Sequence, residues 1–189
     1  EHPVISVNGN VAALVPKETV ELAKATGAKL EVNIFYREEG RIEAIEKTLR
    51  EAGAEEILGL GDVEPESLSN LSSNRRIVDP RGIFKADAVL VPLEDGDRTE
   101  NLVEKGKLVI AIDLNPLSRT AQMAQITIVD NLIRCFPKMT EVAKKLRRQK
   151  EDRGEESLRT IVDNFDQKEN LDQAVQLIID YLEKQKLTK

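Results

Sequence analysis

Apolar and polar positions along the chain follow two alternating patterns, short apolar runs and longer stretches with helical spacing. Two runs, 88–93 and 108–112, are continuously apolar, which is typical of strands buried on both faces of a parallel sheet. Shorter apolar or alternating runs predict further strands. The predicted strands are Val4–Val7, Lys29–Phe35, Glu56–Leu60, Ala88–Leu93, Leu108–Ile112 and Gln125–Val129.

Helical spacing of apolar residues separates most of these runs. In the first such stretch Pro16 suits a first helical turn, and Gly27 is a natural helix stop. The apolar stripe of the last helix predicts that it faces the core, whereas the polar segment Asp62–Gly82 predicts a long loop. The predicted helices are Val11–Ala23, Glu38–Ala52, Asn101–Lys105, Asn131–Gln149, Glu155–Phe165 and Leu171–Lys186.

This alternation of strands and helices predicts the fold class. We expect a Rossmann-like three-layer α/β/α sandwich with a mainly parallel sheet and a C-terminal helical extension. The charged stretch 144–156 marks the expected boundary. Residues 1–150 would form the ligand-binding domain, and the helices of residues 151–189 would pack on it.

Composition narrows the classes of protein. The 189 residues are 40% hydrophobic and 33% charged, as in soluble globular proteins. The formal net charge of −6 argues against a general nucleic-acid binder. No apolar run approaches the roughly 20 residues of a membrane span. The single cysteine, Cys135, allows no intrachain disulfide, so we expect a cytoplasmic protein.

Polar loops follow several predicted strands, and this edge of an open α/β sheet is where ligands bind. The first loop is Asn8-Gly9-Asn10, between a strand and a helix. Gly9 permits close approach of the backbone to a ligand, and the following helix start could receive an anion. An ordinary turn capped by asparagine explains the same residues.

The second loop, after the apolar run 88–93, carries Glu94, Asp95, Asp97 and Arg98. Three carboxylates so close together repel one another unless a cation balances them. They could bind Mg²⁺ or the ammonium group of a substrate. The alternative is a solvated acidic turn in which Asp97 or Thr99 caps the next helix.

The third loop, 113–120, follows the apolar run 108–112 and is the strongest candidate. Asp113 could hold a ribose hydroxyl group, Asn115 could bond a base edge, and Arg119 could bind phosphate. A proline-stiffened turn with a surface arginine is the alternative. Asp130-Asn131 follows another strand and could both cap a helix and complete the site.

Four segments together resemble one family. They are 2–16, 91–100, 111–121 and 126–131, and their motifs resemble those of archaeal 4-phosphopantoate–β-alanine ligases, also called phosphopantothenate synthetases. The resemblance covers most of residues 2–145. It implies condensation of 4-phosphopantoate with β-alanine to 4′-phosphopantothenate, AMP and pyrophosphate through an acyl adenylate, in coenzyme A biosynthesis. It also implies ATP as a substrate, Mg²⁺ as a cofactor and a homodimer.

The resemblance also assigns roles to residues. Nucleotide contacts map onto the third loop and onto the start of the helix after the strand 125–129. These residues are Asp113, Leu114, Asn115, Arg119, Thr120, Asn131 and Leu132. We infer the remaining roles from what this reaction needs, not from the resemblance. Asn8, Gly9 and Asn10 would hold phosphopantoate or phosphate. As catalytic residues, Glu94, Asp95 and Asp97 would receive the β-alanine ammonium group or Mg²⁺, and Arg98 would fix their loop. The identity of any metal ligands stays open.

Other functions remain open at this level. A non-catalytic nucleotide-binding module would explain the same loops, as would an ATP-dependent ligase for another acid and amine. The resembling family carries an N-terminal helical segment with basic residues that contribute to the nucleotide site. Because Glu1 stands first here, we expect a truncated product that keeps the fold but loses activity.

Overall fold

The computed structural model describes residues 2–36, 38–68, 76–153 and 156–186. Its centre is a five-stranded parallel sheet in the order β2-β1-β5-β6-β7, so the predicted parallel sheet is confirmed. The strands are β1 (Pro3–Val7), β2 (Lys29–Val32), β5 (Ala88–Pro92), β6 (Leu108–Asp113) and β7 (Ile126–Val129).

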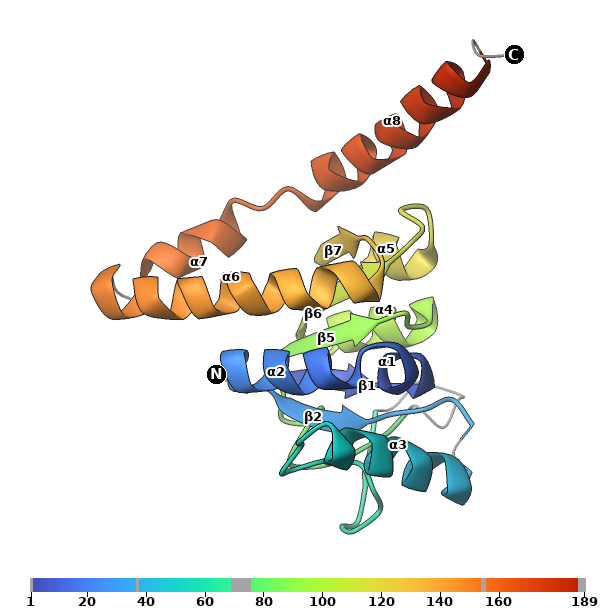
Figure 1. The fold of residues 1–189 in the computed structure, drawn as a ribbon, viewed down its shortest axis with the longest axis vertical. Coiled ribbons are helices and arrows are strands. Elements are labelled where there is room, and N and C mark those ends of the chain that lie inside the picture. Colours follow the sequence, from blue (N-terminus) through green and yellow to red (C-terminus); the bar gives the residue numbers. More distant parts are fainter. Residues whose placement is uncertain (1, 37, 69–75, 154–155, 187–189) are drawn as a thin grey trace.

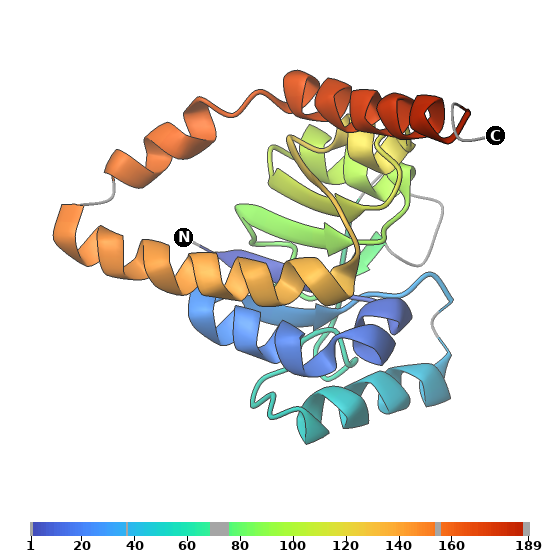
Figure 2. The same ribbon diagram turned by 45° about the horizontal axis from the view of Figure 1, so that its top comes forward.

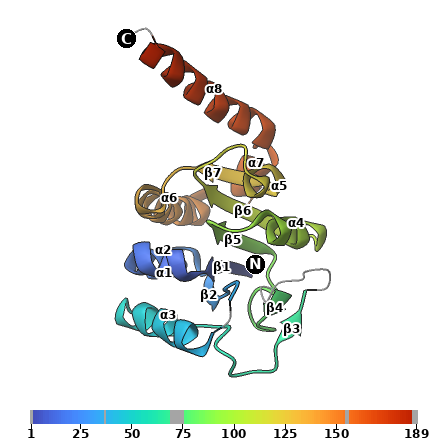
Figure 3. The ribbon, with the colours of Figure 1, turned by 90° about the vertical axis from the view of Figure 1, so that its right-hand side faces the viewer.

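Helices cover both faces of the sheet, which confirms the three-layer arrangement (Figures 1 and 3). One face carries α1 (Gly9–Leu14), α2 (Pro16–Thr26), α3 (Glu39–Glu51) and α6 (Leu132–Arg153). The other face carries α4 (Gly96–Glu104) and α5 (Arg119–Met123). No helix in the described ranges is long and apolar enough to cross a membrane.

Alternation along β1 explains how the two faces are filled. Ile5 and Val7 belong to the core cluster under α1 and α2, whereas Val4 joins the cluster that contains Leu102 of α4. Successive side chains of a strand point to opposite faces, so a strand covered on both sides must be apolar throughout. Ser6 is a fully buried polar exception on the α4 side.

Two predictions about the region between α3 and β5 were wrong. The predicted strand Glu56–Leu60 is reduced to one bridge, in which Leu58 pairs in parallel with Glu31. The predicted loop Asp62–Gly82 contains a two-stranded antiparallel pair, β3 (Glu66–Ser67) and β4 (Ile77–Val78), although residues 69–75 lie outside the described part. The segment therefore folds back onto the sheet face beside β2.

The C-terminal helices are α7 (Glu156–Asp163) and α8 (Gln167–Lys186), close to the predicted ranges. The start of α8 is fixed to the edge strand β7: Thr127 donates its N–H to Gln167 at 2.9 Å, and Asn170 donates to the Thr127 carbonyl at 2.9 Å. Figures 1 and 2 show α8 passing this edge and extending away from the sheet.

The apolar stripe of α8 does not face the core along its length. Leu171 is 6% exposed and contributes to the core as predicted. Farther along, Ile178, Ile179 and Leu182 are 45%, 42% and 53% exposed, so the prediction was wrong for them. The physical reason is that α8 leaves the sheet edge after its first turns and finds no partner surface in the described chain.

Candidate functional site

The strand order reverses direction between β1 and β5. If the single bridge at Leu58 is counted as an outer strand, the chain first builds outward through β1 and β2, then returns to build β5, β6 and β7 on the other side. Open α/β sheets bind ligands at the carboxyl ends of the strands beside such a switch point. The first two predicted loops, 8–10 and 94–98, start there.

Asn8 connects the two strands at the switch point. Its side-chain amide donates to the carbonyls of Pro92 at 2.9 Å and Leu93 at 3.2 Å. Its side-chain oxygen accepts the N–H groups of Asn10 and Val11, which caps α1. The Asn8 side chain is thus occupied by the protein, and Gly9 and exposed Asn10 are the parts of this loop available to a ligand.

Leu93 has a backbone conformation that sequence reasoning missed. Its φ of 50° lies in the left-handed region, and no other non-glycine residue of the described chain has a positive φ. Its N–H donates to the Ile112 carbonyl at 2.9 Å, so both neighbouring strands hold it. A leucine in this conformation costs free energy and indicates a functional constraint where the chain turns from β5 into the acidic loop.

Glu94 and Arg98 form a buried ion pair directly after this turn. The Arg98 guanidinium donates to Glu94 at 2.9 Å and to the Ser6 hydroxyl at 3.0 Å, and both charged side chains are fully buried. Burial lowers the pKa of Arg98 to about 10, against the raising effect of the Glu31 and Asp95 carboxylates. These two buried hydrogen bonds join the acidic loop to Ser6 of β1.

Two nitrogen atoms of the Arg98 guanidinium, Nε and Nη2, have no hydrogen-bond partner among the described residues. A buried charged donor without an acceptor costs free energy. This polar cluster would be difficult to recognise in the sequence, because Ser6 and Arg98 are 92 positions apart.

The three acids of this loop do not converge on one point. Glu94 is held by Arg98, Asp95 accepts the Arg98 N–H as the cap of α4, and Asp97 pairs with Arg119. No group of three or more acidic, histidine or cysteine side chains able to hold a metal is found in the described ranges. The protein residues described here do not fit a Mg²⁺ site of their own.

Asp113 organises the third loop through its two carboxylate oxygens. One accepts the Asn115 N–H at 2.9 Å and the other accepts the Ser118 hydroxyl at 2.6 Å. Ser118 also caps α5 by accepting the Ala121 N–H. Asn115 and Leu114 remain exposed at the strand end, with Leu114 58% exposed.

The second and third loops are joined by two contacts. The Thr120 hydroxyl, which is buried, donates to the Glu94 carbonyl at 2.7 Å. The Arg119 guanidinium forms ion pairs with Asp97 and Glu100 of α4. A Cβ on Gly96 would lie 2.5 Å from Arg119 Cγ, so the loops approach as closely as they do because residue 96 is glycine.

The fourth loop follows β7. Asp130 accepts the Asn131 N–H and pairs with Arg134, while Asn131 accepts the Ile133 N–H at 3.0 Å as a helix cap. Partial burial raises the pKa of Asp130, but the bonds from Asn131 and Arg134 outweigh it and lower the pKa overall. The Leu132 side chain is buried in the core, which leaves its backbone for any ligand contact.

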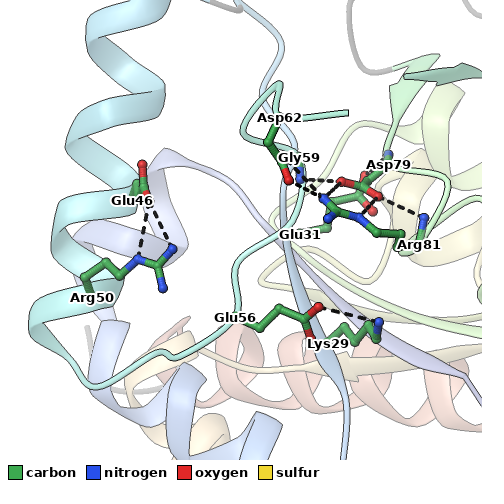
Figure 4. Close-up of polar contacts among 9 residues, drawn as sticks. All are labelled: Lys29, Glu31, Glu46, Arg50, Glu56, Gly59, Asp62, Asp79 and Arg81. Carbon is green, nitrogen blue, oxygen red and sulfur yellow. Dashed lines mark hydrogen bonds and ion pairs between the residues drawn. The ribbon is translucent and has the colours of Figure 1, made fainter. Parts of the chain in front are cut away.

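A second polar network, absent from the sequence predictions, surrounds Glu31 of β2 (Figure 4). Its buried carboxyl group accepts the N–H groups of Asp79 at 3.0 Å and Ile83 at 2.6 Å. Asp79 accepts the Gly59 N–H at 3.2 Å and pairs with Arg81. The network holds the segment after the Leu58 bridge against the sheet. In the sequence, Glu31 stands in an alternating strand pattern that gave no sign of this role.

A comparison of the chain with known proteins agrees with this architecture. The profile of the family described as phosphopantothenate/pantothenate synthetase matches residues 1–181. A 4-phosphopantoate–β-alanine ligase of Thermococcus kodakarensis is 54% identical over 183 residues, which cover 96% of this chain and 68% of that protein. The Methanosarcina mazei protein of the same name is 48% identical over 182 residues, covering 96% of this chain and 69% of the relative.

Two findings show the family. The chain is 54% identical to a relative over nearly its whole length, and the family profile extends from residue 1 to residue 181. The loops that carry the sequence resemblance lie at the carboxyl edge of the sheet, and residues of the second and third are in contact there. The chain therefore belongs to the phosphopantothenate/pantothenate synthetase family.

Proposed function

We propose that this chain is an ATP-dependent ligase that joins 4-phosphopantoate to β-alanine in coenzyme A biosynthesis. The products are 4′-phosphopantothenate, AMP and pyrophosphate. Two relatives with the corresponding name share 54% and 48% identity with the chain over 96% of its length. The structural observation that carries the proposal is the joining of the second and third loops through Thr120 and Arg119 at one edge of the sheet.

The reaction proceeds through an acyl adenylate in this proposal. A carboxylate oxygen of 4-phosphopantoate attacks the α-phosphorus of ATP, and the bond to pyrophosphate breaks. The β-alanine ammonium group first loses one proton to solvent. The free amine then attacks the acyl carbon and loses a second proton, while AMP leaves with the electron pair of the broken carbon–oxygen bond. Both steps bring negative groups together, so positioning and charge neutralisation are the main requirements.

The nucleotide lies, in this proposal, at the ends of β6 and β7. Asp113, Leu114 and Asn115 border the ribose and base, and Arg119 binds phosphate. Thr120 and Leu132 are buried, so they act by holding the loop and through the backbone. The binding residues are Asp113, Leu114, Asn115, Arg119, Thr120, Asn131 and Leu132.

The acidic loop receives the β-alanine ammonium group. Asp97 is the accessible carboxylate, with a side chain 68% exposed, whereas the side chain of Glu94 is fully enclosed with Arg98. Glu94, Asp95 and Arg98 act by holding the loop in position. In this proposal Mg²⁺ enters as the ion that accompanies ATP, because the described carboxylates form no group of three that could hold it without the nucleotide.

4-Phosphopantoate occupies the end of β1 beside the switch point. Gly9 and Asn10 face the ligand there, and Asn8 holds the strand end in place through Pro92 and Leu93. In this proposal the acidic loop after β5 lies between 4-phosphopantoate at β1 and the nucleotide at β6 and β7, so the reacting carboxylate extends past this loop towards the α-phosphate.

We also propose that the chain acts as a homodimer in the cytoplasm, where ATP is available. The support for a dimer is the apolar surface of the C-terminal helices. Ile161 is 57% exposed on α7, and Leu177 and Tyr181 are 70% and 61% exposed on α8. Large apolar side chains exposed along these two helices are typical of an interaction face.

Product analysis by mass spectrometry tests the function. The chain is incubated with magnesium and ATP, 4-phosphopantoate and β-alanine, and each omission serves as a control. Formation of AMP and phosphopantothenate only with all substrates supports the ligase. Transfer of ¹⁸O from the 4-phosphopantoate carboxylate to AMP supports the acyl adenylate, whereas ADP as product would indicate an acyl phosphate. Nucleotide binding without any product would instead favour a binding module.

A further inference from the structure

Arg41 lies beside the predicted phosphopantoate loop, at the carboxyl edge of the sheet. It belongs to the first turns of α3, which follows β2, and α1 and α3 are in contact. Its terminal nitrogen Nη2 is 3.7 Å from the position that a Cβ on Gly9 would take. The guanidinium group therefore borders the backbone at the end of β1, next to the switch point.

The charge of Arg41 is not neutralised by the described protein. The residue is exposed, and no hydrogen bond or ion pair of its guanidinium group is found among residues 2–36, 38–68, 76–153 and 156–186. The arginines of the other loops differ, because Arg98 pairs with Glu94, Arg119 with Asp97 and Glu100, and Arg134 with Asp130.

The helix start beside Arg41 offers little to an anion by itself. The N–H groups of Asn10 and Val11 are both taken by the Asn8 side chain. α1 is also only six residues long. A doubly charged phosphate at this place thus requires a cation, and a guanidinium group can donate two parallel hydrogen bonds to phosphate oxygens.

The substrate named in the proposed function has two anionic ends. Its carboxylate must reach the nucleotide, and its phosphate must be held elsewhere so that the two do not exchange places. We propose that Arg41 binds the phosphate of 4-phosphopantoate and is the residue by which the enzyme prefers this substrate over unphosphorylated pantoate. This inference rests on the proposed function and adds a specificity-determining residue to it.

The test compares Arg41→Ala with Lys47→Ala, which removes a positive charge from an exposed position on the same helix. Binding of 4-phosphopantoate and of pantoate is measured by calorimetry, and steady-state kinetics are measured in parallel. We expect Arg41→Ala to weaken 4-phosphopantoate binding about 10- to 100-fold. Pantoate binding and the KM values for ATP and β-alanine stay within about twofold, while Lys47→Ala keeps the preference for the phosphorylated substrate.

The outcomes separate the inference from the proposed function. If the unsubstituted chain forms phosphopantothenate and Arg41→Ala keeps its preference for the phosphorylated acid, the role of Arg41 is overturned and the function stands. If no amide forms but Arg41→Ala still weakens 4-phosphopantoate binding relative to Lys47→Ala, the role of Arg41 stands and the function fails. No binding of 4-phosphopantoate by the unsubstituted chain would overturn the inference.

Discussion

The Arg119 guanidinium group is engaged by carboxylates before any phosphate arrives. Hydrogen bonding to Glu100 and the nearby Asp97 raise the pKa of Arg119, so it keeps its charge at neutral pH. The Arg119 and Asp97 side chains are 56% and 68% exposed. Ion pairs this exposed to solvent contribute little to stability, so a phosphate chain of higher charge can replace these partners at small cost.

Replacing this arginine therefore tests the nucleotide site directly. We expect Arg119→Ala to weaken ATP binding about 10- to 100-fold, because a charged hydrogen bond to phosphate is lost. Isothermal calorimetry with ATP measures the effect. Arg50→Ala serves as a control, since Arg50 of α3 bonds Glu46 and the carbonyl of Glu55 after the helix, and is given no role in the site. An ATP dissociation constant unchanged within twofold would remove Arg119 from the site.

The carboxyl group of Glu31 is buried, unlike the exposed Arg119, and its burial changes its pKa. Burial raises its pKa to about 7, although the Ile83 and Asp79 N–H groups and the charge of Arg98 act in the opposite direction. The folded protein then holds a proton that the unfolded chain releases above its usual pKa of 4.5. The free energy of unfolding contributed by this group must fall as the pH rises between these values.

We predict a decrease of about 3 kcal/mol in the free energy of unfolding between pH 4.5 and pH 7 from Glu31. Urea titrations at several pH values measure it, and Glu31→Gln removes it because the amide does not titrate. The two proteins then differ in slope over this window and run parallel above pH 7. Equal slopes below pH 7 would show that Glu31 does not titrate there.

The Asp79 carboxyl group is predicted to have the opposite effect on how the free energy of unfolding changes with pH. Partial burial raises its pKa, but the hydrogen bonds from Arg81 and Gly59 lower it overall. Its contribution is therefore present above the usual value of 3.8 and is lost as the pH falls further. The Asp79 effect lies below the window of Glu31, so the two can be measured separately.

At the scale of elements, the hydrophobic pattern of the sequence predicts those helices and strands whose formation depends on neighbouring residues of the chain. Strands β5 and β6 were predicted correctly because a strand that is buried on both faces must be apolar at nearly every position. The predicted strand at 56–60 failed because only Leu58 finds a partner on the outer edge of β2. The number of residues that pair with a neighbouring strand depends on residues distant in sequence. A local hydrophobic pattern contains no information about them.

The same reasoning applies to the candidate site. Polar loops after strands were predictable, since parallel strands end at the same edge. The contacts that join them, such as Thr120 to Glu94 and Asn8 to Pro92, span 26 and 84 positions and were not predictable. The left-handed conformation of Leu93 was not predictable from the sequence either, because leucine rarely adopts a positive φ.

The approach of α4 to the start of α5 depends on Gly96. A Cβ there would lie 2.5 Å from Arg119 Cγ and 2.6 Å from its Cβ. We expect Gly96→Ala to lower the free energy of unfolding by about 1–3 kcal/mol and to weaken ATP binding, because Arg119 must move. Urea unfolding and calorimetry measure the two effects.

Gly40→Ala is the matched control for this element. Gly40 lies near the start of α3, and no atom is found within 4 Å of its added Cβ in the described chain. Alanine also has the higher helix propensity, so this variant should be neutral or stabilised by up to about 1 kcal/mol. If Gly96→Ala behaved in the same way, close packing against Arg119 would not constrain the loop.

At the scale of the molecule, the candidate ligand site and the proposed dimer surface lie at different edges of the sheet. The loops of the candidate site lie at the carboxyl ends of the strands, whereas α8 is attached at the β7 edge and extends away from the sheet. Gln167 and Asn170 bond the backbone of Thr127 on the edge strand β7, so this part of the edge is covered before α8 departs. The remaining length of α8 has an apolar face with no partner in the described chain.

The proposed homodimer predicts that this face is covered by a second copy in solution. Ile178 lies near the centre of the apolar face of α8 and is 45% exposed. We expect Ile178→Lys to shift the chain from dimer to monomer in light scattering over a range of concentrations, because a charge placed in an apolar interface must be desolvated. Circular dichroism establishes that the variant keeps its helices.

Gln176→Lys is the matched control, because residue 176 lies on the opposite side of α8 and its side chain bonds Asp180. The added charge there leaves the apolar face intact, so this variant should remain dimeric. A dimer that survives Ile178→Lys would place the interface elsewhere. A monomer at all concentrations for the unsubstituted chain would contradict the homodimer itself. If the dimer dissociates only in Ile178→Lys, α8 contributes an assembly surface separate from the ligand edge of the sheet.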